Sequence, residues 1–591
     1  MPRRILPVIL FLTTTTLAQT PQQPAPQPAW IAKSNAYTQQ LLDLDKKYSP
    51  ENASYEGLAE YDPQISVPTL ANQLAERKDT EVILAKLVAA RKTEKDELVA
   101  QDLDILIDST NRGFRSQDFT RTHKVPFINA SAVIFGGVQA LLDDQVTPDR
   151  RKAALIRLHK YVGAEPGFQP MTTILLQRIQ EQMAKPGIIY PSKTLVETEL
   201  GRNSQRVEGI AALFKKYNLT GWEADYATLQ KQLTDYDTWV RANVLPKART
   251  DFRLPPEEYA INLSNYGVDL TPTQLATLGH SAYTEIQAQM KTIAAQIAKQ
   301  RNLPSSDYRD VIRELKQSQL TNDEILPFYE KRLHEIEAII VKQNLVTLPD
   351  RPAIIRLGTP AESVQQPAPH MVPPPFLHNT GQRGVFVLPL NMPAAPGKAA
   401  SAKVDDYTYD AATWTLIAHE ARPGHELQFD SMVEKGVSNA RAIFAFNSTN
   451  AEGWGLYSEY ITLPYMPLEG QLISLQFRLL RAARIYLDPE LQAGKVTPDQ
   501  ALHVLTDDVV FSVPFATQEV ERYTFRSPGQ ATSYYYGYTR LLSLRKEAEQ
   551  TLGSKFDQHR YHDFILSQGL LPPDLMKKAV EEDFIRTEKS R

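Results

Sequence analysis

Apolar residues recur at three- and four-residue spacing along most of the chain, and this pattern predicts a mainly helical protein. Between about residues 31 and 345, long helical stretches follow one another. Three of them begin with a capping signal, in which a Thr precedes Pro or acidic residues, at Thr147, Thr271 and Thr321. We therefore expect residues 31–345 to form a helical N-terminal lobe.

The pattern changes between about residues 346 and 410, where Pro and small residues dominate and the run 373–375 is Pro-Pro-Pro. Within this stretch, residues 384–388 are mostly β-branched and aromatic and predict a short strand. Pro389 favours an edge position for that strand, because proline cannot donate to a β-ladder. Helical periodicity then returns and continues nearly to the end, so we treat residues 346–591 as a second region.

The first residues have the three parts of a secretory signal peptide: Arg3 and Arg4, an apolar run, and small residues ending at Ala18. The apolar run is shorter than the roughly 20 residues that a membrane span requires. Residues 19–30 are rich in Pro and Gln and are typical of a flexible linker. We expect residues 1–18 to be cleaved and the protein to be exported, periplasmic or extracellular, with no membrane span afterwards.

The composition limits the kinds of site and partner that the chain can have. The chain has no cysteine, so it cannot form disulfides or lipid-modified cysteines, and any metal site must use His, Asp or Glu. The formal net charge is −4 and the basic residues form no tracts, which makes nucleic acid an improbable partner.

The segment His-Glu-Ala-Arg-Pro-Gly-His, residues 419–425, ends an apolar helical stretch with two histidines and a glutamate. A hydrolytic zinc centre needs neutral imidazoles as ligands and a nearby carboxylate that accepts a proton from water. We expect His419 and His425 to bind one zinc ion and Glu420 to act as general base.

The six-residue spacing of His419 and His425 is unusual, because a regular helix would place the two side chains roughly 120° apart. Pro423 removes a backbone donor, and Gly424 tolerates dihedral angles that other residues avoid. We expect this dipeptide to interrupt the helix and to turn His425 towards the metal.

A third ligand is expected from Ala-Glu-Gly-Trp-Gly-Leu-Tyr-Ser-Glu, residues 451–459. Glu452 and Glu459 are seven residues apart and therefore lie on one face of a helix. We assign Glu452 to the metal. Glu459 then fits a role behind the ligands, where it would orient a histidine or an arginine.

Three segments, HEARPGHELQ, EGWGLYSE and PGQATSYYYG, resemble the signature blocks of DUF885, a bacterial family of unknown function that is regarded as zincin-like and related to the gluzincin peptidases. The resemblance covers most of the chain after the linker. It implies a mainly α, zincin-like fold with a short edge-strand sheet and a helical lobe around a cleft. Related peptidases carry their ligand Glu seven residues before another Glu, which favours Glu452 over Glu459.

By the same resemblance, a Tyr hydroxyl stabilises the oxyanion that forms during hydrolysis. Tyr534 aligns with the family's position, and Tyr535 and Tyr536 are alternatives. Gln530 would bind substrate, and Arg522 would either hold a substrate carboxylate or pair with an acid such as Glu459.

Two further segments match the related families. Arg481 and Arg484 lie in a family block that continues with Gly and His, where this chain has Glu490 and Gln492. In gluzincins an edge strand beside the active-site helix pairs with the substrate backbone, and this role would fall to the strand that contains Val385 and Phe386.

These expectations converge on an exported zinc metallopeptidase that hydrolyses short peptides by Glu420-assisted attack of zinc-bound water, with residues 346–591 as its catalytic region. A zinc hydrolase of non-peptide or cell-wall amides would use the same residues. An inactive helical binding protein is a third alternative, although such a relic would be expected to lose Glu420 first.

Overall fold

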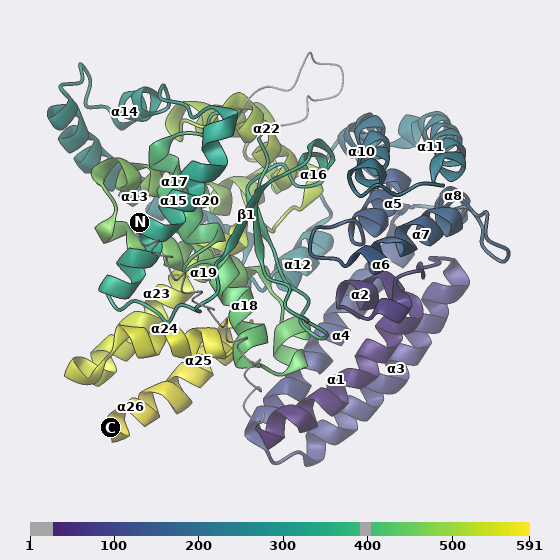
Figure 1. Ribbon diagram of the computed structural model, residues 1–591, viewed down its shortest axis with the longest axis horizontal. Helices are drawn as coiled ribbons and strands as arrows, with labels where there is room; N and C mark the ends of the chain where they lie inside the picture. The colour runs from purple at the N-terminus through teal and green to yellow at the C-terminus, as the bar shows by residue number, and fades with distance from the viewer. Residues whose placement is uncertain (1–27, 391–403) are drawn as a thin grey trace, which may run out of the picture.

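The computed structural model describes residues 28–390 and 404–591, and it is mainly helical with one small sheet (Figure 1). The predicted signal peptide and nearly all of the predicted linker lie outside the described residues. The helices of the first half are α1 Ala29–Tyr48, α2 Pro50–Tyr55, α3 Leu70–Thr93, α4 Glu97–His123, α5 Ala130–Gln139, α6 Pro148–Arg151, α7 Ala153–Tyr161, α8 Met171–Met183, α9 Lys193–Gly201, α10 Asn203–Lys216 and α11 Glu223–Asn243.

The middle of the chain contributes α12 Pro256–Asn265, α13 Pro272–Arg301, α14 Tyr308–Leu315, α15 Asn322–Lys342 and α16 Pro360–Gln365. The last part contributes α17 Asp410–Glu420, α18 His425–Lys435, α19 Ser448–Thr462, α20 Leu468–Gln492, α21 Pro498–His503, α22 Val513–Glu521, α23 Thr532–Leu552, α24 Gln558–Ser567, α25 Pro573–Ala579 and α26 Arg586–Ser590. A π-helical turn, η6 Arg522–Arg526, follows α22 directly.

The predicted capping signals are confirmed where the helices begin. Helix α13 starts at Pro272 and α15 at Asn322, and each has a reciprocal capping box between its Thr and the side chain three residues later. Helix α6 starts directly after Thr147, but the Thr147 side chain makes no capping hydrogen bond. At α13 and α15, polar capping groups thus satisfy backbone donors that the helix itself leaves unpaired.

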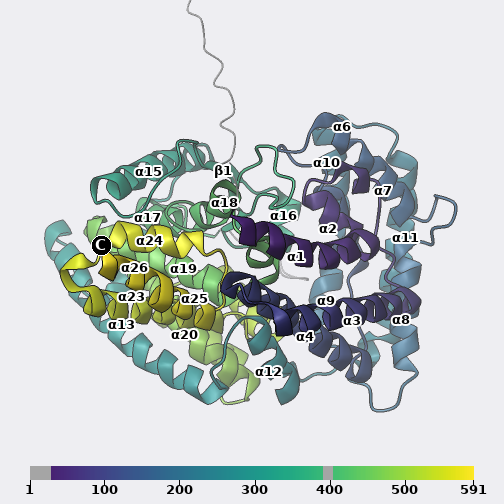
Figure 2. The same cartoon turned by 90° about the horizontal axis from the view of Figure 1, so that it is seen from below.

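The molecule contains two large apolar cores. One is built from residues 65–244 together with Ala361, and the other joins residues 259–346 to the helices after residue 404. Helix α13 runs alongside α20, and α19 lies against α23 (Figure 2). Helices α12–α15, which precede residue 345, therefore pack with the C-terminal helices and help to hold them in place.

The sheet has the order β1-β3-β2, in which β1 Ile354–Leu357 pairs parallel and β2 His370–Val372 pairs antiparallel with β3 Val385–Leu388. The predicted strand is present, but the predicted edge position is wrong. Pro389 follows the last paired residue, Leu388, so it does not interrupt the ladder. All four residues of β3 are buried, and β2 occupies an edge instead.

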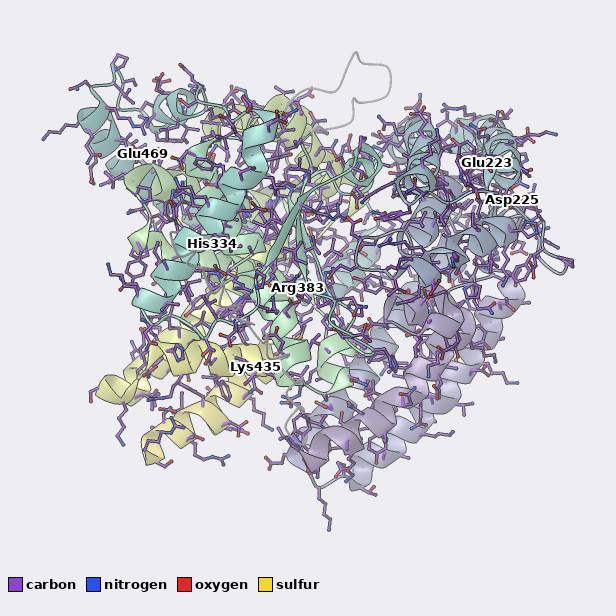
Figure 3. All side chains as sticks on the ribbon, in the orientation of Figure 1. Glu223, Asp225, His334, Arg383, Lys435 and Glu469 are labelled. Carbon is purple, nitrogen blue, oxygen red and sulfur yellow. The ribbon has the colours of Figure 1, made fainter. Side chains whose placement is uncertain are left out.

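Charged side chains of both signs lie on the outside of the molecule, as Glu223 and Lys435 illustrate (Figure 3). None of the helices within the described residues is both long enough and apolar enough to cross a membrane.

Candidate metal centre

Helix α17 carries the first two site residues and stops directly after them. It ends at Glu420, and α18 begins at His425, so the helix is interrupted between the two histidines. The interruption contains the non-helical residues Ala421 and Gly424, and it brings His425 back beside His419. The two imidazole rings lie 4.7 Å apart between centroids and are nearly perpendicular.

Two glycines make this close packing sterically feasible. A Cβ on Gly424 would lie 1.9 Å from the backbone oxygen of His419, and a Cβ on Gly455 would lie 2.5 Å from the His419 ring. Side chains at these positions would therefore push the turn and α19 away from His419.

The side chains of His419, His425 and Glu452 converge on one point. In the described part of the chain, one potential ligand atom from each residue lies within 4.8 Å of the other two. Oε2 of Glu452 lies 3.5 Å from Nε2 of His419 and 3.4 Å from Nε2 of His425. Glu452 comes from α19, so two separate parts of the sequence supply the cluster.

These separations fit a tetrahedral zinc ion. Zinc bonds of about 2.0–2.1 Å to nitrogen and oxygen place neighbouring ligand atoms about 3.3–3.4 Å apart. The donor set of two imidazoles and one carboxylate is also the one used by catalytic zinc sites that keep a fourth position open. The three residues thus suit zinc in both chemistry and spacing.

Electrostatics favour an ionised Glu452. Burial raises the pKa of its carboxyl, but the neighbouring imidazoles of His419 and His425 outweigh this effect, so the pKa lies well below its usual range. An ionised carboxylate is the form that binds a metal ion.

Glu459 lies behind the cluster, as its seven-residue spacing from Glu452 predicts. Its Oε1 lies 2.7 Å from Nδ1 of His419, and its Oε2 accepts a hydrogen bond from Thr415 at 2.9 Å. The carboxylate therefore holds the His419 ring through the nitrogen that does not face Glu452.

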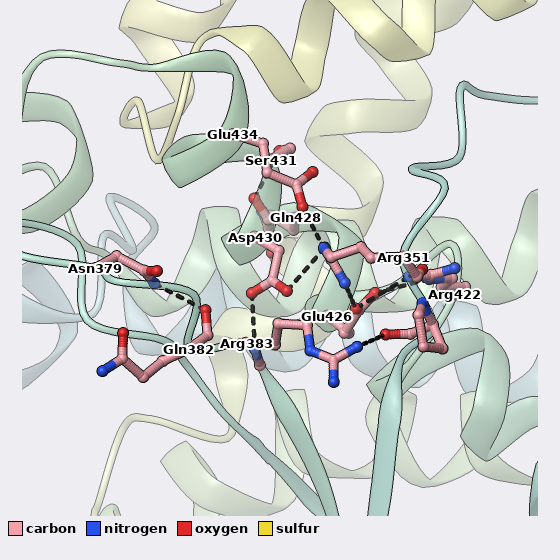
Figure 4. A network of polar contacts seen from close by, with 12 residues as sticks. Arg351, Asn379, Gln382, Arg383, Arg422, Glu426, Gln428, Asp430, Ser431 and Glu434 are labelled. Carbon is pink, nitrogen blue, oxygen red and sulfur yellow. Dashed lines mark hydrogen bonds and ion pairs between the residues drawn. The ribbon is translucent and has the colours of Figure 1, made fainter. Parts of the chain in front are cut away.

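A set of ion pairs holds α18, the helix that begins with His425 (Figure 4). Arg351 pairs with Glu426, Asp430 and Glu434, which lie one turn apart along α18. Asp430 also accepts a hydrogen bond from the backbone nitrogen of Gly384 at 2.8 Å, beside the first residue of β3. These contacts fix the orientation of α18 against the sheet.

The cluster opens into a cavity of about 720 Å³, which His419, Glu420, His425 and Glu452 help to line. Of the three candidate tyrosines, only Tyr534 belongs to its lining, and its ring stacks 6.5 Å from the His419 ring. Tyr536 instead donates a hydrogen bond to Asp269. Tyr535, the other alternative to Tyr534, packs on Tyr538 and is not part of the lining.

Of the other residues predicted to contact substrate, some line the cavity and some do not. Arg522 and Gln530 line the cavity. Val385 and Phe386 do not, because they lie in the buried central strand, so the expectation that they contact substrate is wrong. The cavity wall on that side is formed by residues 366–371, which lead into and include the first residues of β2.

Glu519 is among the cavity residues that the sequence prediction missed, and its carboxylate pairs with both Arg484 and Arg522. Its position three residues before Arg522 is a spacing at which helical side chains meet, and this signal could have revealed it. Arg481 and Arg484, which matched a family block without an assigned role, also line the cavity.

Comparisons with known proteins place the chain among proteins of unknown function. No match was found among curated proteins. A solved structure described as a "putative lipoprotein of unknown function" from Shewanella oneidensis is 20% identical, covers 94% of this chain and 100% of its own, and has a TM-score of 0.69. A "putative lipoprotein" from Colwellia psychrerythraea is 18% identical, covers 94% and 99%, and has a TM-score of 0.75.

At these identities the two structures establish a shared fold and nothing further about activity. The family comparison is more specific, because the profile described as "Bacterial protein of unknown function (DUF885)" matches residues 50–580. That match covers most of the chain, including both histidines, Glu452 and Tyr534, and the chain therefore belongs to the DUF885 family.

Proposed function

We propose that the chain is a zinc-dependent metallopeptidase with a zincin-like, gluzincin-related active site. The observation that carries the proposal is the convergence of His419, His425 and Glu452, with ligand atoms 3.4 and 3.5 Å apart, at a cavity that Glu420 also lines. When bound there, zinc supplies Lewis-acid activation of water and of a substrate carbonyl.

Glu420 has the placement of a general base. It follows ligand His419 directly, and within the described residues its carboxylate makes no hydrogen bond or ion pair, so it is free to accept a proton. In this role Glu420 takes a proton from the attacking water and returns it to the leaving amine.

Tyr534 has the placement of an oxyanion donor. Nη2 of Arg522 donates to the Tyr534 hydroxyl oxygen at 2.7 Å, which leaves the hydroxyl hydrogen available to another acceptor. Burial raises the pKa of Tyr534 although Arg522 opposes the shift, so the phenol keeps its proton at neutral pH. A fixed, protonated donor beside the reacting carbonyl is what stabilisation of a tetrahedral oxyanion requires.

The substrate class follows from the size of the cavity. A volume of about 720 Å³ is in the range that holds one small ligand, which suits a short peptide. We also propose that the protein works outside the cytoplasm, since residues 1–18 have the pattern of a secretory signal.

The test compares the zinc-loaded protein with Glu420→Gln on a library of short peptides. We expect the variant to keep its zinc and to lose about 10²–10⁴-fold in kcat, because the ligands remain while the proton acceptor is removed. Peptide cleavage at an unchanged rate by the variant, or no cleavage of any peptide by the zinc-loaded wild type, would overturn the proposal.

A further inference from the structure

Three arginines surround Tyr534 in the cavity. The guanidinium carbons of Arg481, Arg484 and Arg522 lie 6.0, 4.5 and 5.1 Å from the centroid of the Tyr534 ring. All three arginines line the cavity, and the side chains of Arg481 and Arg484 are only 6% and 5% exposed. Positive charge is thus concentrated beside the proposed oxyanion donor.

Two carboxylates form ion pairs with these three guanidinium groups. Glu519 pairs with Arg484 through two bonds of 2.7 Å and reaches Arg522 at 3.4 Å. Arg522 also holds the Tyr534 hydroxyl, so its role is to position that group. Among the described residues, Glu459 is the only carboxylate that pairs with Arg481, at 3.7 Å, and it is already bound to His419. Nη1 of Arg481 donates to the backbone oxygen of Phe477 at 3.1 Å.

Two buried donors in this cluster have no hydrogen-bond acceptor among the described residues: Nε of Arg481 and Nη1 of Arg484. A buried charged donor without a partner is costly, and a carboxylate is the strongest acceptor for it. Burial lowers the pKa of Arg481, and the neighbouring Arg484 lowers it further, so an added negative charge would be favourable there.

The side chain of Arg481 lies near the proposed reaction centre. A single atom, Oε1 of Glu459, lies 3.7 Å from Nη2 of Arg481 and 2.7 Å from Nδ1 of ligand His419. A substrate group bound at Arg481 would therefore lie close to the scissile bond.

We propose that Arg481 and Arg484 form a subsite that binds a carboxylate of the substrate close to the cleaved bond. This inference rests on the proposed peptidase function, because it takes the bound carboxylate to belong to a peptide that the protein cleaves. Either of two groups could supply this carboxylate. One is the free C-terminus of a peptide, in which case the enzyme would remove terminal residues. The other is an acidic side chain.

The test measures binding, so that it does not depend on turnover. Four ligands are titrated calorimetrically into zinc-loaded Glu420→Gln protein: acetyl-Ala-Ala with a free carboxylate, the same peptide as its amide, and the amides of acetyl-Ala-Glu and acetyl-Ala-Gln. We expect at least one anionic ligand to bind about tenfold or more tightly than its neutral partner. The pair that shows the difference identifies the source of the carboxylate.

A substitution on helix α20 then assigns the preference to the subsite. Arg481→Gln should reduce the preference to about twofold or less, and Arg481→Lys should retain part of it. Arg478→Gln is the matched control, because Arg478 lies on the same helix, is 5% exposed and also has unpaired nitrogens, but does not line the cavity. It should leave the preference unchanged.

Equal binding of charged and neutral ligands, a preference that survives Arg481→Gln, or no binding of any of the four ligands at about 5 mM would overturn the subsite. Failure of the peptidase proposal has a different signature, in which the anionic ligand binds preferentially but the zinc-loaded wild type never cleaves it.

Discussion

The carboxylate of Glu459 lies 2.7 Å from Nδ1 of His419, while Nε2 of the same ring faces Glu452. An ionised Glu459 requires the proton of a neutral imidazole to be on Nδ1, which leaves the Nε2 lone pair for a metal. Burial raises the pKa of Glu459, but Arg481 and His419 outweigh burial and keep it below its usual value. One acid thus sets both the tautomer and the orientation of the ligand.

Replacing Glu459 with Gln should weaken zinc binding about 10–100-fold, because the amide cannot hold the imidazole as a carboxylate does. The zinc dissociation constant is measured by competition with a chelator. Thr415→Val, which removes only the hydrogen bond to the second carboxylate oxygen, should have a smaller effect. Equal affinities for wild type and Glu459→Gln would show that Glu459 does not support the ligand.

Tyr534→Phe should lower kcat about 10²–10³-fold with little change in zinc content, because it removes one oxyanion donor. Tyr535→Phe and Tyr536→Phe are the controls, since neither residue lines the cavity. If either control lost as much activity as Tyr534→Phe, the assignment of the donor would be wrong.

The Arg351 ion pairs should contribute strongly to stability. The partner side chains Glu426 and Asp430 are 0% and 3% exposed, so Arg351→Gln removes a cation from two buried carboxylates, of which Glu426 keeps its ion pair with Arg422. We expect the free energy of unfolding in urea to fall by about 3–5 kcal/mol. Arg313→Gln removes an ion pair to Asp310 whose side chains are both 53% exposed, and it should cost less than about 1 kcal/mol. Similar losses for the two variants would contradict this account.

Asp488 should make stability depend on pH. Burial raises its pKa to about 7 from an ordinary value of 3.8, although Tyr259 opposes the shift. The folded protein therefore binds more protons than the unfolded chain between about pH 4 and pH 7, and this contribution to stability is lost as the pH rises through that window. Each unit of pKa difference corresponds to about 1.4 kcal/mol.

Asp488→Asn resembles the protonated acid at every pH, so it should gain stability relative to wild type between pH 5 and pH 8. Urea unfolding of both proteins across this range measures the difference. An exposed control, Asp104→Asn, should show no such trend, because the Asp104 side chain is 51% exposed. A difference between Asp488→Asn and wild type that is constant with pH would contradict the assignment.

Local signals in the sequence predicted the helices well, because a Thr with a partner three residues later satisfies its own backbone donors, as at Thr271 and Thr321. The position of the strand in its sheet could not be predicted in this way. Its partners Ile354–Leu357 and His370–Val372 are too short to show a period, and pairing is a long-range property.

Local spacing in the sequence also predicted part of the metal site. Spacing placed Glu452 and Glu459 on one face of a helix and the family resemblance favoured Glu452 as the ligand, whereas spacing did not indicate which arginines face the cavity. Arg478, Arg481 and Arg484 are three residues apart on α20, and each step turns the side chain about 60° around the helix. Because α20 is buried on nearly all sides, only the packing determines that Arg481 and Arg484 face the cavity and Arg478 does not.

The zinc content of the purified chain tests the central claim most directly. After saturation with zinc and desalting, mass spectrometry should find one zinc ion per chain in the wild type and none in His419→Ala/His425→Ala. The control His280→Ala/His503→Ala removes two histidines whose side chains are 54% and 73% exposed, and it should keep one zinc ion. A wild type without zinc, or a His419/His425 double variant with as much zinc as wild type, would contradict the account.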